Sequence, residues 1–365
     1  MNLNELSKNL LVPPGEGVFT VNTAKERKDE LHQKLFPNSK DIRKSWEESL
    51  DKVEQSKMIV LGVCSDTGGG ILRGANWGPL FLRQTLHKDQ PKIINDPNVL
   101  DIGDVRVIPH LLHDKYLNEK TITNCQKALY QNTSNKLPVS PLSITEHWLD
   151  KLYETHPEKR VFSIGGDHSV SYPLTKSYLK HKKSLGKKVA IIHFDAHTDL
   201  LIERLGIDLC FGSWCSHILE YLPSPDHLIQ IGIRSSGKER GHWENKFGVQ
   251  QYWSEQVIKD GADSIAKEID SFLERSKVDE LYISFDIDAL DSEYASATGT
   301  PEDNGLAPHH CSLIIQELGK KYNITGADMV EIAPFLNTRD SQSQETTLTV
   351  GASLSAIIIQ ELLKN

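Results

Sequence analysis

The sequence predicts an α/β fold of three layers, in which helices cover both faces of a mainly parallel central sheet. From residue 57 onward, short β-branched segments alternate with longer segments of helical periodicity, which is the pattern of βαβ units. Several of the short segments are almost continuously apolar, as expected for strands that are buried on both faces. No linker or shift in composition divides this part of the 365-residue chain, so we expect one large domain over residues 51–365.

The individual elements follow from these segments in chain order. The expected strands are the apolar runs at 58–63, 99–102, 161–164, 189–194, 228–233, 281–285 and 324–331. The expected helices are the periodic segments at 78–86, 145–154, 262–275, 310–318 and 348–363. Long connections between successive strands favour parallel pairing, because a tight hairpin would make the pair antiparallel.

The first 50 residues have a different character. They are rich in charge and interrupted by Pro13, Pro14 and Pro37, with a Lys- and Glu-rich stretch at 24–34. We interpret residues 1–50 as an N-terminal arm. Two alternatives stay open: the arm covers the active-site rim or a neighbouring subunit, or it packs on the core as a solvated helix.

Composition excludes several classes of partner. The formal net charge of −9 and the pI near 5.9 oppose binding to phosphate backbones, so we expect no nucleic-acid partner. Five cysteines, an odd number, without a secretory leader at the N-terminus indicate reduced thiols and a cytoplasmic location. No stretch approaches 18 consecutive apolar residues, so we expect no membrane span.

Clusters of aspartate and histidine follow three of the predicted strands. Ligands of open α/β sheets bind beyond the carboxyl ends of the strands, where these clusters lie. Side chains at alternate positions of an extended segment point to the same side. Six side chains are therefore expected to face a common point: His168, Asp195, His197, Asp199, Asp286 and Asp288.

The chemistry of this set indicates metal binding. Four carboxylates that lie close together need cations beside them to stay ionised, and two divalent ions would balance their charge. Imidazole and carboxylate without thiolate suit Mn, Fe, Co, Ni or catalytic Zn. A single such residue at a strand end is more often a turn or helix cap, but three clusters in one chain favour a site. Two metal ions can also generate a hydroxide nucleophile at neutral pH.

Three motifs carry a specific resemblance. The segments at 163–169 (SIGGDHS), 193–199 (HFDAHTD) and 284–291 (SFDIDALD) resemble the metal-binding signatures of the arginase, agmatinase and formimidoylglutamase (ureohydrolase) superfamily, from about residue 57 to the C-terminus. The resemblance implies an arginase-like fold and two metal ions. The first ion would be bound by His168, Asp195, Asp199 and Asp286. The second would be bound by Asp195, His197, Asp286 and Asp288.

The resemblance also implies the roles of single residues. Asp195 and Asp286 would bridge the ions, and Asp199 would pass a proton to the leaving nitrogen. Glu331, in the segment MVEIAP at 329–334, matches the family glutamate that pairs with the guanidinium or amidinium of the substrate. Mn²⁺ is the default metal, and Ni²⁺ or Fe²⁺ also suit the ligands. Homo-oligomers are common in the family, so we expect one here.

The chain departs from arginase where the substrate binds. Arginases and agmatinases usually carry a His-Gly dipeptide after the DAHxD motif, and here Phe211 and Gly212 stand in its place. The segment at 200–203 (LLIE) also lacks the polar residues by which arginases hold the amino-acid head group. We expect the substrate pocket at Phe211, Trp214, Ser235 and His193. His193 is alternatively a hydrogen-bonding partner of a ligand or a packed strand residue.

These inferences predict a dinuclear-metal hydrolase that cleaves a C–N bond of a small cationic guanidino or formimino substrate and releases urea or formamide. Agmatinase-like, formimidoylglutamase-like and guanidine hydrolase activities stay open, and L-arginine is disfavoured. The main alternative is a catalytically silent metal-binding relative that acts as a regulatory or binding partner. A two-metal phosphatase or deacetylase would use similar ligands but would not explain Glu331.

Overall fold

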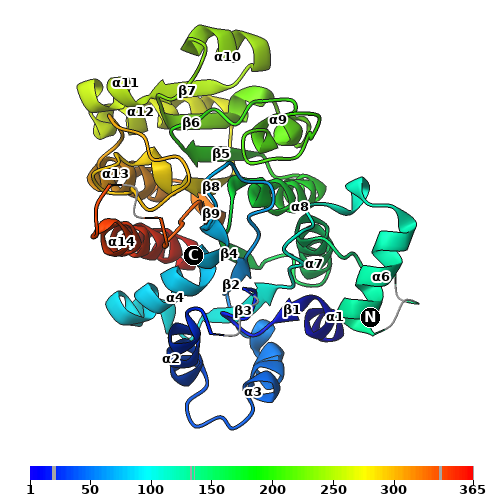
Figure 1. Cartoon of the computed structure of the whole chain (residues 1–365). Helices are drawn as coiled ribbons and strands as arrows, with labels where there is room; N and C mark the ends of the chain where they lie inside the picture. Colours follow the sequence, from blue (N-terminus) through cyan, green and yellow to red (C-terminus); the bar gives the residue numbers. More distant parts are fainter. Residues whose placement is uncertain (19–21, 132–133, 135, 337–338, 365) are drawn as a thin grey trace.

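The computed structural model describes residues 1–18, 22–131, 134, 136–336 and 339–364. In these residues nine strands form one sheet in the order β1-β3-β2-β4-β9-β8-β5-β6-β7 (Figure 1). All strand pairs are parallel except β1 with β3. The strands are β1 (Leu11–Val12), β2 (Met58–Val63), β3 (Val99–Val105), β4 (Arg160–Gly165), β5 (Val189–Phe194), β6 (Leu228–Ile233), β7 (Gln250–Trp253), β8 (Glu280–Asp286) and β9 (Asn323–Val330).

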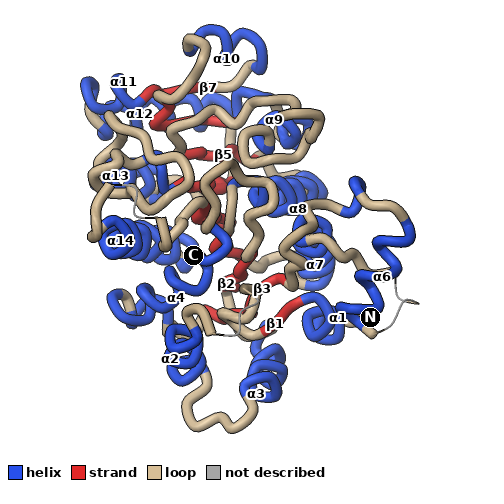
Figure 2. Tube along the Cα trace, viewed as in Figure 1, coloured by secondary structure: helices blue, strands red, loops and turns tan. Residues whose placement is uncertain are grey.

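Helices flank this sheet on both sides, as Figure 2 shows for helices in blue and strands in red. They are α1 (Leu3–Leu10), α2 (Lys25–Leu35), α3 (Ile42–Ser49), α4 (Gly78–Asp89), α5 (Pro91–Ile94), α6 (Glu119–Tyr130), α7 (Pro141–Thr155), α8 (Ser171–Ser184), α9 (Trp214–Ile218), α10 (Arg240–Phe247), α11 (Ser254–Asp260), α12 (Ala262–Ser276), α13 (Pro308–Gly319) and α14 (Ser343–Leu363). The predicted three-layer α/β/α class is therefore confirmed.

Two apolar cores lie on the two faces of the sheet. One core joins the sheet to α4, α12, α13 and α14, and the other joins it to α1, α7, α8 and α9. The interior strands β2, β5 and β6 are buried along their whole length, because helices cover both of their faces. This arrangement explains why their sequences are almost continuously apolar.

The predicted strands differ from the observed ones mainly at the sheet edges. Strands β2, β5 and β6 begin and end at the predicted residues. The edge strands β1 and β7 were not predicted, because β1 has two residues and β7 begins with the polar pair Gln250 and Gln251. Strand β9 ends at Val330 rather than at the predicted Glu331, which adopts the left-handed conformation at φ 63°.

The described residues of the predicted N-terminal arm pack along the β3 edge of the sheet (Figure 1). Leu11 of β1 pairs with Val105 of β3, and the Leu11 side chain is fully buried. Trp46 of α3 is also fully buried, and its Nε1 donates a hydrogen bond of 2.9 Å to the Ile102 carbonyl. The segment therefore belongs to the sheet's own packing, and the domain boundary near residue 50 stays a prediction.

A buried ion-pair network ties this N-terminal segment to the core. Arg83 of α4 is fully buried, and its Nε lies 2.8 Å from Asp101 Oδ2 while its Nη1 contacts Asp104. Asp104 Oδ2 also accepts hydrogen bonds from the backbone N–H of Gly15 at 2.8 Å and of Gly17 at 2.9 Å. Each charge is thus compensated inside the fold, as burial of charges requires.

Helix α14 bears on the prediction that the chain has no membrane span. By length and composition it is long and apolar enough to cross a membrane, although no such segment was expected. However, 61% of its most apolar window is buried inside the structure, where α14 packs against α4, α13 and β9. Its apolar character is therefore accounted for by the core.

We predict that Asp104→Ala destabilises the fold by about 3–5 kcal/mol, because it leaves the Arg83 guanidinium buried without one of its partners. Urea denaturation followed by tryptophan fluorescence measures this change. Lys88→Ala is the control, because it removes an exposed pair with Glu345 at 3.5 Å and should cost less than about 1 kcal/mol. Equal midpoints for the two variants would show that the Asp104 network does not stabilise the fold.

Candidate metal centre

The aspartate and histidine clusters meet at one edge of the sheet. Strands β4, β9, β8 and β5 are parallel neighbours, so their carboxyl ends lie side by side. His168 follows β4, Asp195 follows β5, Asp286 ends β8 and Glu331 follows β9. Parallel pairing therefore brings together groups that are more than 100 residues apart in the chain.

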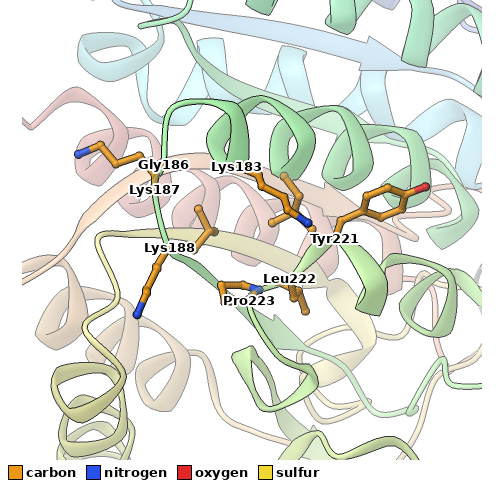
Figure 3. Close-up of a pocket in the computed structure, with 9 residues that line it drawn as sticks. Lys183, Gly186, Lys187, Lys188, Tyr221, Leu222 and Pro223 are labelled. Carbon is orange, nitrogen blue, oxygen red and sulfur yellow. The ribbon is translucent and has the colours of Figure 1, made fainter.

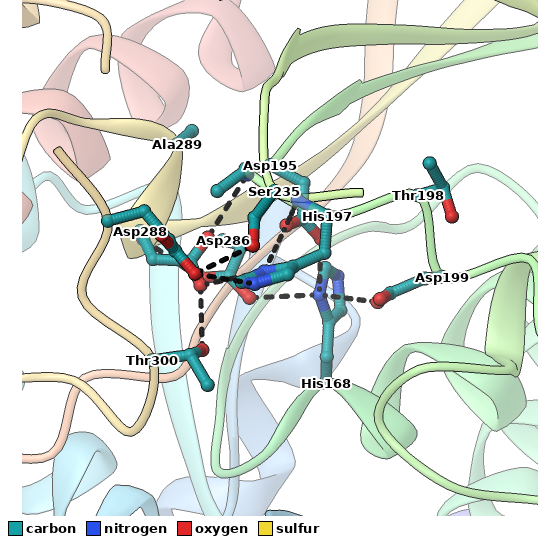
Figure 4. A network of polar contacts seen from close by, with 12 residues as sticks. His168, Asp195, His197, Thr198, Asp199, Ser235, Asp286, Asp288, Ala289 and Thr300 are labelled. Carbon is teal, nitrogen blue, oxygen red and sulfur yellow. Dashed lines mark hydrogen bonds and ion pairs between the residues drawn. The ribbon is translucent and has the colours of Figure 1, made fainter. Parts of the chain in front are cut away.

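The His168 imidazole is the centre of the first group of candidate ligands (Figure 4). Its Nδ1 lies 3.1 Å from Asp195 Oδ2, 3.2 Å from Asp199 Oδ2 and 3.1 Å from Asp286 Oδ2. The His168 side chain is 1% exposed, and its Nδ1 has no hydrogen-bond partner although three carboxylate oxygens surround it. One nitrogen cannot donate a hydrogen bond to three oxygens at once.

These separations fit a shared cation. Ligand atoms that lie about 2.0–2.2 Å from one ion and at right angles to each other are about 3 Å apart. The three distances from His168 Nδ1 have this value. The donor set of one imidazole and three carboxylates also neutralises a divalent charge, so the residues present fit a divalent metal ion.

A second group lies beside the first and shares Asp195 with it. His197 Nδ1 is 3.3 Å from Asp195 Oδ1 and 3.1 Å from Asp288 Oδ2. Because the two oxygens of Asp195 face different groups, its carboxylate is placed to bridge two ions. Asp286 Oδ2 faces His168, while its Oδ1 accepts a hydrogen bond of 2.8 Å from the Asp288 backbone N–H. The second bridge, by Asp286, stays a prediction.

Neighbouring groups hold the candidate ligands in position. Asp288 accepts hydrogen bonds from the Ala196 backbone N–H at 3.1 Å and from the Thr300 hydroxyl at 2.9 Å. Asp199 Oδ2 accepts a hydrogen bond of 2.9 Å from the indole Nε1 of Trp214. Thr300 could not be predicted from the sequence, because a threonine in a loop carries no signal of its own.

The position of the proton on the His168 imidazole follows from its contact with Ser284, which is itself hydrogen-bonded to the buried Asp328. Ser284 Oγ donates to Asp328 Oδ1 at 2.9 Å, so the same oxygen accepts from His168 Nε2 at 3.1 Å. In the neutral imidazole, the proton on Nε2 leaves the lone pair of Nδ1 directed at the three carboxylates. Ser284 and Asp328 are both fully buried in strands. Ser284 alternates with Tyr282 and Asp286 along β8, whereas Asp328 carries no such signal in β9.

Glu331 lies next to the first group on a strained turn. Its φ of 63° is in the left-handed region, which is uncommon for a residue other than glycine. Its Oε1 accepts a hydrogen bond of 2.8 Å from the His168 backbone N–H, and its side chain is buried. Burial, together with the negative charges of Asp286 and Asp167, raises the pKa of Glu331 well above its usual range. A cation bound there would remove this cost.

The predicted pocket residues occupy two different environments. Trp214 and His193 are fully buried, so neither can line a solvent-accessible pocket, which corrects that part of the prediction. His193 Nε2 lies 2.9 Å from Asp195 Oδ2, and Trp214 contacts Asp199, so both lie behind the carboxylates.

Phe211 and Ser235, by contrast, are half-buried. The Phe211 N–H donates to the Gly68 carbonyl at 3.1 Å, which joins it to the loop that contains Gly68, Gly69 and Gly70. Ser235 Oγ donates to Glu302 Oε1 at 2.7 Å, and this oxygen lies 3.5 Å from His197 Nε2. Glu302 was missed because no motif contains it.

The protonation of the clustered aspartates and histidines depends on whether cations neutralise them. Burial and the neighbouring carboxylates raise the pKa of both Asp199 and Asp286 well above the usual range. Burial alone would lower the pKa of His168, but the close carboxylates of Asp195, Asp286 and Asp199 outweigh it and raise that pKa. Protons must therefore neutralise the cluster wherever cations do not.

A separate cavity of about 270 Å³ lies at the opposite end of β5 (Figure 3). It is lined by residues that include Lys183, Lys188 and Tyr221. The metal candidates follow the carboxyl end of β5, whereas Lys188 immediately precedes its first residue. This cavity is therefore not part of the site.

Comparison with known proteins agrees with this geometry. Residues 56–359 match the model of the Arginase family, and the chain belongs to that family. Family membership implies a dinuclear site for divalent metal ions, and the two groups above contain the candidate ligands.

Among individual proteins, the chain is 36% identical over 208 residues to the agmatinase of Citrobacter koseri and 35% identical to that of Escherichia coli. These matches cover 56% of this chain and 61% of each agmatinase, so the chain spans about three fifths of the length of these curated relatives.

Solved structures agree in fold. A hypothetical agmatinase from Burkholderia thailandensis superposes with a TM-score of 0.63 at 26% identity, covering 85% of this chain and 86% of that one. Formimidoylglutamase from Bacillus subtilis superposes with a TM-score of 0.64 at 21% identity, covering 84% of this chain and 88% of that one. At 21% identity, the likeness to formimidoylglutamase shows a shared fold only.

We predict that Trp214→Phe weakens metal binding by about 10–100-fold, because Asp199 loses the N–H donor that orients it. Competition with a chelator measures the affinity of the purified protein. Trp148→Phe is the matched control, since its indole donates to Ser7 at 2.9 Å in the contact between α7 and α1. Equal affinities for the two variants would show that the Trp214 hydrogen bond does not support the site.

Proposed function

We propose that this protein is a hydrolase with two divalent metal ions that cleaves a C–N bond in a small guanidino or amidine cation. The observation that carries the proposal is the His168 Nδ1 atom, buried without a hydrogen-bond partner among three carboxylate oxygens. Beside it lies a buried carboxylate, Glu331, that no described side chain of opposite charge neutralises in an ion pair. A cationic substrate would supply the positive charge that pairs with the Glu331 carboxylate.

The proposed ligands follow the two groups. His168, Asp195, Asp199 and Asp286 would hold one ion, and Asp195, His197, Asp286 and Asp288 the other. When bound, a pair of divalent ions supplies a hydrolytic nucleophile at neutral pH. Mn²⁺ is our first choice of metal, and Ni²⁺ and Fe²⁺ suit the same imidazole and carboxylate donors.

The protein's own residues bind the substrate and move a proton. Glu331 pairs with the planar cation and orients its central carbon, because a carboxylate can accept two parallel N–H bonds from it. Asp199 delivers a proton to the leaving nitrogen as the C–N bond breaks, and Trp214 holds Asp199 in place for that transfer. Phe211 and the loop with Gly68 narrow access to the site. The products are an amine or ammonia together with urea or formamide.

The surroundings favour a substrate without an amino-acid head group. Leu201 and Ile202 are 41% and 54% exposed where arginases carry polar residues that bind this group. An apolar surface offers no partner for an α-amino or α-carboxyl group. We therefore propose a small guanidino cation of the agmatine type first, with guanidine and formimino compounds as alternatives, and disfavour L-arginine.

We further propose that the protein acts in the cytoplasm as a homo-oligomer. All five cysteines are free in the structure, which suits a reducing compartment. The alternative function is a catalytically silent metal-binding relative with a regulatory role. Such a relative would retain all six candidate metal ligands, so only a measurement of turnover distinguishes it from the enzyme.

Metal content and turnover test the proposal together. We expect about two equivalents of a divalent transition metal per chain, and release of urea or formamide from one member of a panel of agmatine, other guanidino acids, guanidine and formiminoglutamate. Asp288→Ala should lose metal and activity. Protein that binds two ions but turns over no substrate would support the silent relative. Protein that stays metal-free after loading with Mn²⁺ or Ni²⁺ would contradict the site.

We predict that Glu331→Gln lowers kcat/KM by about 10²-fold or more while metal content stays unchanged. The amide can still accept the His168 N–H bond, but it no longer offers a charge to the substrate cation, and such a buried pair is worth about 2–5 kcal/mol. Steady-state kinetics and metal analysis measure both effects. Glu154→Gln, an exposed change on α7, is the control, and kinetics equal to it would exclude Glu331 from substrate binding.

A further inference from the structure

A row of buried polar side chains crosses the sheet one layer below the candidate metal ligands. His193 of β5 is paired in register with Gln230 of β6, and Gln230 is paired with Gln251 of β7. All three side chains are fully buried on strands whose other residues are mostly apolar. Figure 1 shows β5, β6 and β7 as consecutive strands of the sheet. Apolar side chains would pack there without needing hydrogen bonds, so a buried polar row is expected only where its hydrogen bonds have a role.

The row forms one continuous chain of hydrogen bonds. Trp253 Nε1 donates to Gln251 Oε1 at 3.0 Å, and Gln251 Nε2 donates to Gln230 Oε1 at 2.8 Å. Gln230 Nε2 lies 3.0 Å from His193 Nδ1, and His193 Nε2 lies 2.9 Å from Asp195 Oδ2. The chain therefore runs from the outer strand of the sheet to the carboxylate that both groups of candidate ligands share.

The direction of every bond in this chain follows from its two ends. An indole N–H only donates, so the oxygen of Gln251 faces Trp253 and its nitrogen faces Gln230. Gln230 Nε2 also donates to the Thr198 carbonyl at 2.6 Å, and a carbonyl oxygen only accepts. Both constraints independently turn the nitrogen of Gln230 toward His193, so the orientation of both amides is determined.

The tautomer of His193 follows in turn. Because the Gln230 nitrogen only donates, His193 Nδ1 must accept, and a neutral imidazole then carries its proton on Nε2. The Cys215 Sγ atom, 3.6 Å from the same Nδ1, is another group that can donate to it. His193 Nε2–H therefore donates to Asp195 Oδ2, and its nitrogen has no lone pair to offer a metal ion.

We propose that Gln230 and Gln251 are positioning residues that hold His193 in the Nε2–H tautomer, so that His193 orients the bridging carboxylate of Asp195 and does not bind metal. The alternative arrangement is direct metal binding by His193, because one of its ring nitrogens lies within 4.8 Å of ligand atoms of His168, Asp195 and Asp199. The tautomer of His193 decides between the two. It rests on the proposed function only in taking Asp195 as a ligand. Hydrogen-bond donors of this kind keep ligands in a single orientation and strengthen metal binding.

The first test is nuclear magnetic resonance of protein labelled with ¹⁵N-histidine, without metal and after loading with diamagnetic Zn²⁺. The His193 signals are assigned by their loss in His193→Gln. We expect a neutral ring with the proton on Nε2 in both states. A proton on Nδ1, or a Nε2 signal typical of a metal-bound nitrogen after loading, would overturn the proposal. This measurement needs no folded variant of Gln230 and no activity, so it is independent of whether the proposed substrate class is right.

The second test changes the chain of hydrogen bonds itself, at Gln230. Gln230→Glu removes the donor to His193 Nδ1 at nearly constant shape, and should move the His193 proton to Nδ1 and lower metal affinity by about 10–100-fold. Gln250→Glu on the neighbouring edge strand β7 is the matched control, because Gln250 Nε2 donates only to the Asp226 carbonyl at 2.9 Å among the bonds described. Gln230→Met, which lacks a donor and carries no charge, replaces Gln230→Glu if that variant does not fold. Tautomer and affinity equal to the control would refute the positioning role.

Discussion

The close approach of buried carboxylates at one edge of the sheet is the constraint on which the rest of the structure depends. Asp195, Asp199 and Asp286 each place an oxygen about 3 Å from one imidazole nitrogen inside the protein. Such a set of like charges is unfavourable without cations or protons to neutralise it. The strand order, the strained turns and the buried polar residues can all be understood as features that hold these groups together.

Backbone strain occurs at two of the positions where the fold directs side chains into this cluster. Asp199 and Glu331 have φ values of 50° and 63°, in a region that costs about 1–2 kcal/mol for residues with a side chain. Both turns are held by hydrogen bonds, from the Trp214 indole to Asp199 and from the His168 N–H to Glu331. Tertiary contacts thus maintain conformations that the local sequence would not adopt by itself.

Support for the ligands comes from residues that lie two positions earlier on the strands. Ser284 precedes Asp286 and contacts His168, whereas His193 precedes Asp195 and contacts it. Because side chains alternate between the two faces of a strand, residues two apart share a face, so the supporting layer lies directly beneath the ligands. Rigid strands therefore carry both layers, which gives the site a fixed geometry before any ion or substrate binds.

The sequence alone determined the fold class, the interior strands β2, β5 and β6, and the six residues that meet at the sheet edge, because apolar runs and clustered aspartates are local signals. It did not reveal β7 or Thr300, since these depend on neighbours far away in the chain. Only the tertiary structure decided that Trp214 and His193 lie behind the carboxylates rather than in the pocket. Burial and hydrogen-bond direction are properties of the packed sheet, and no spacing in the sequence specifies them.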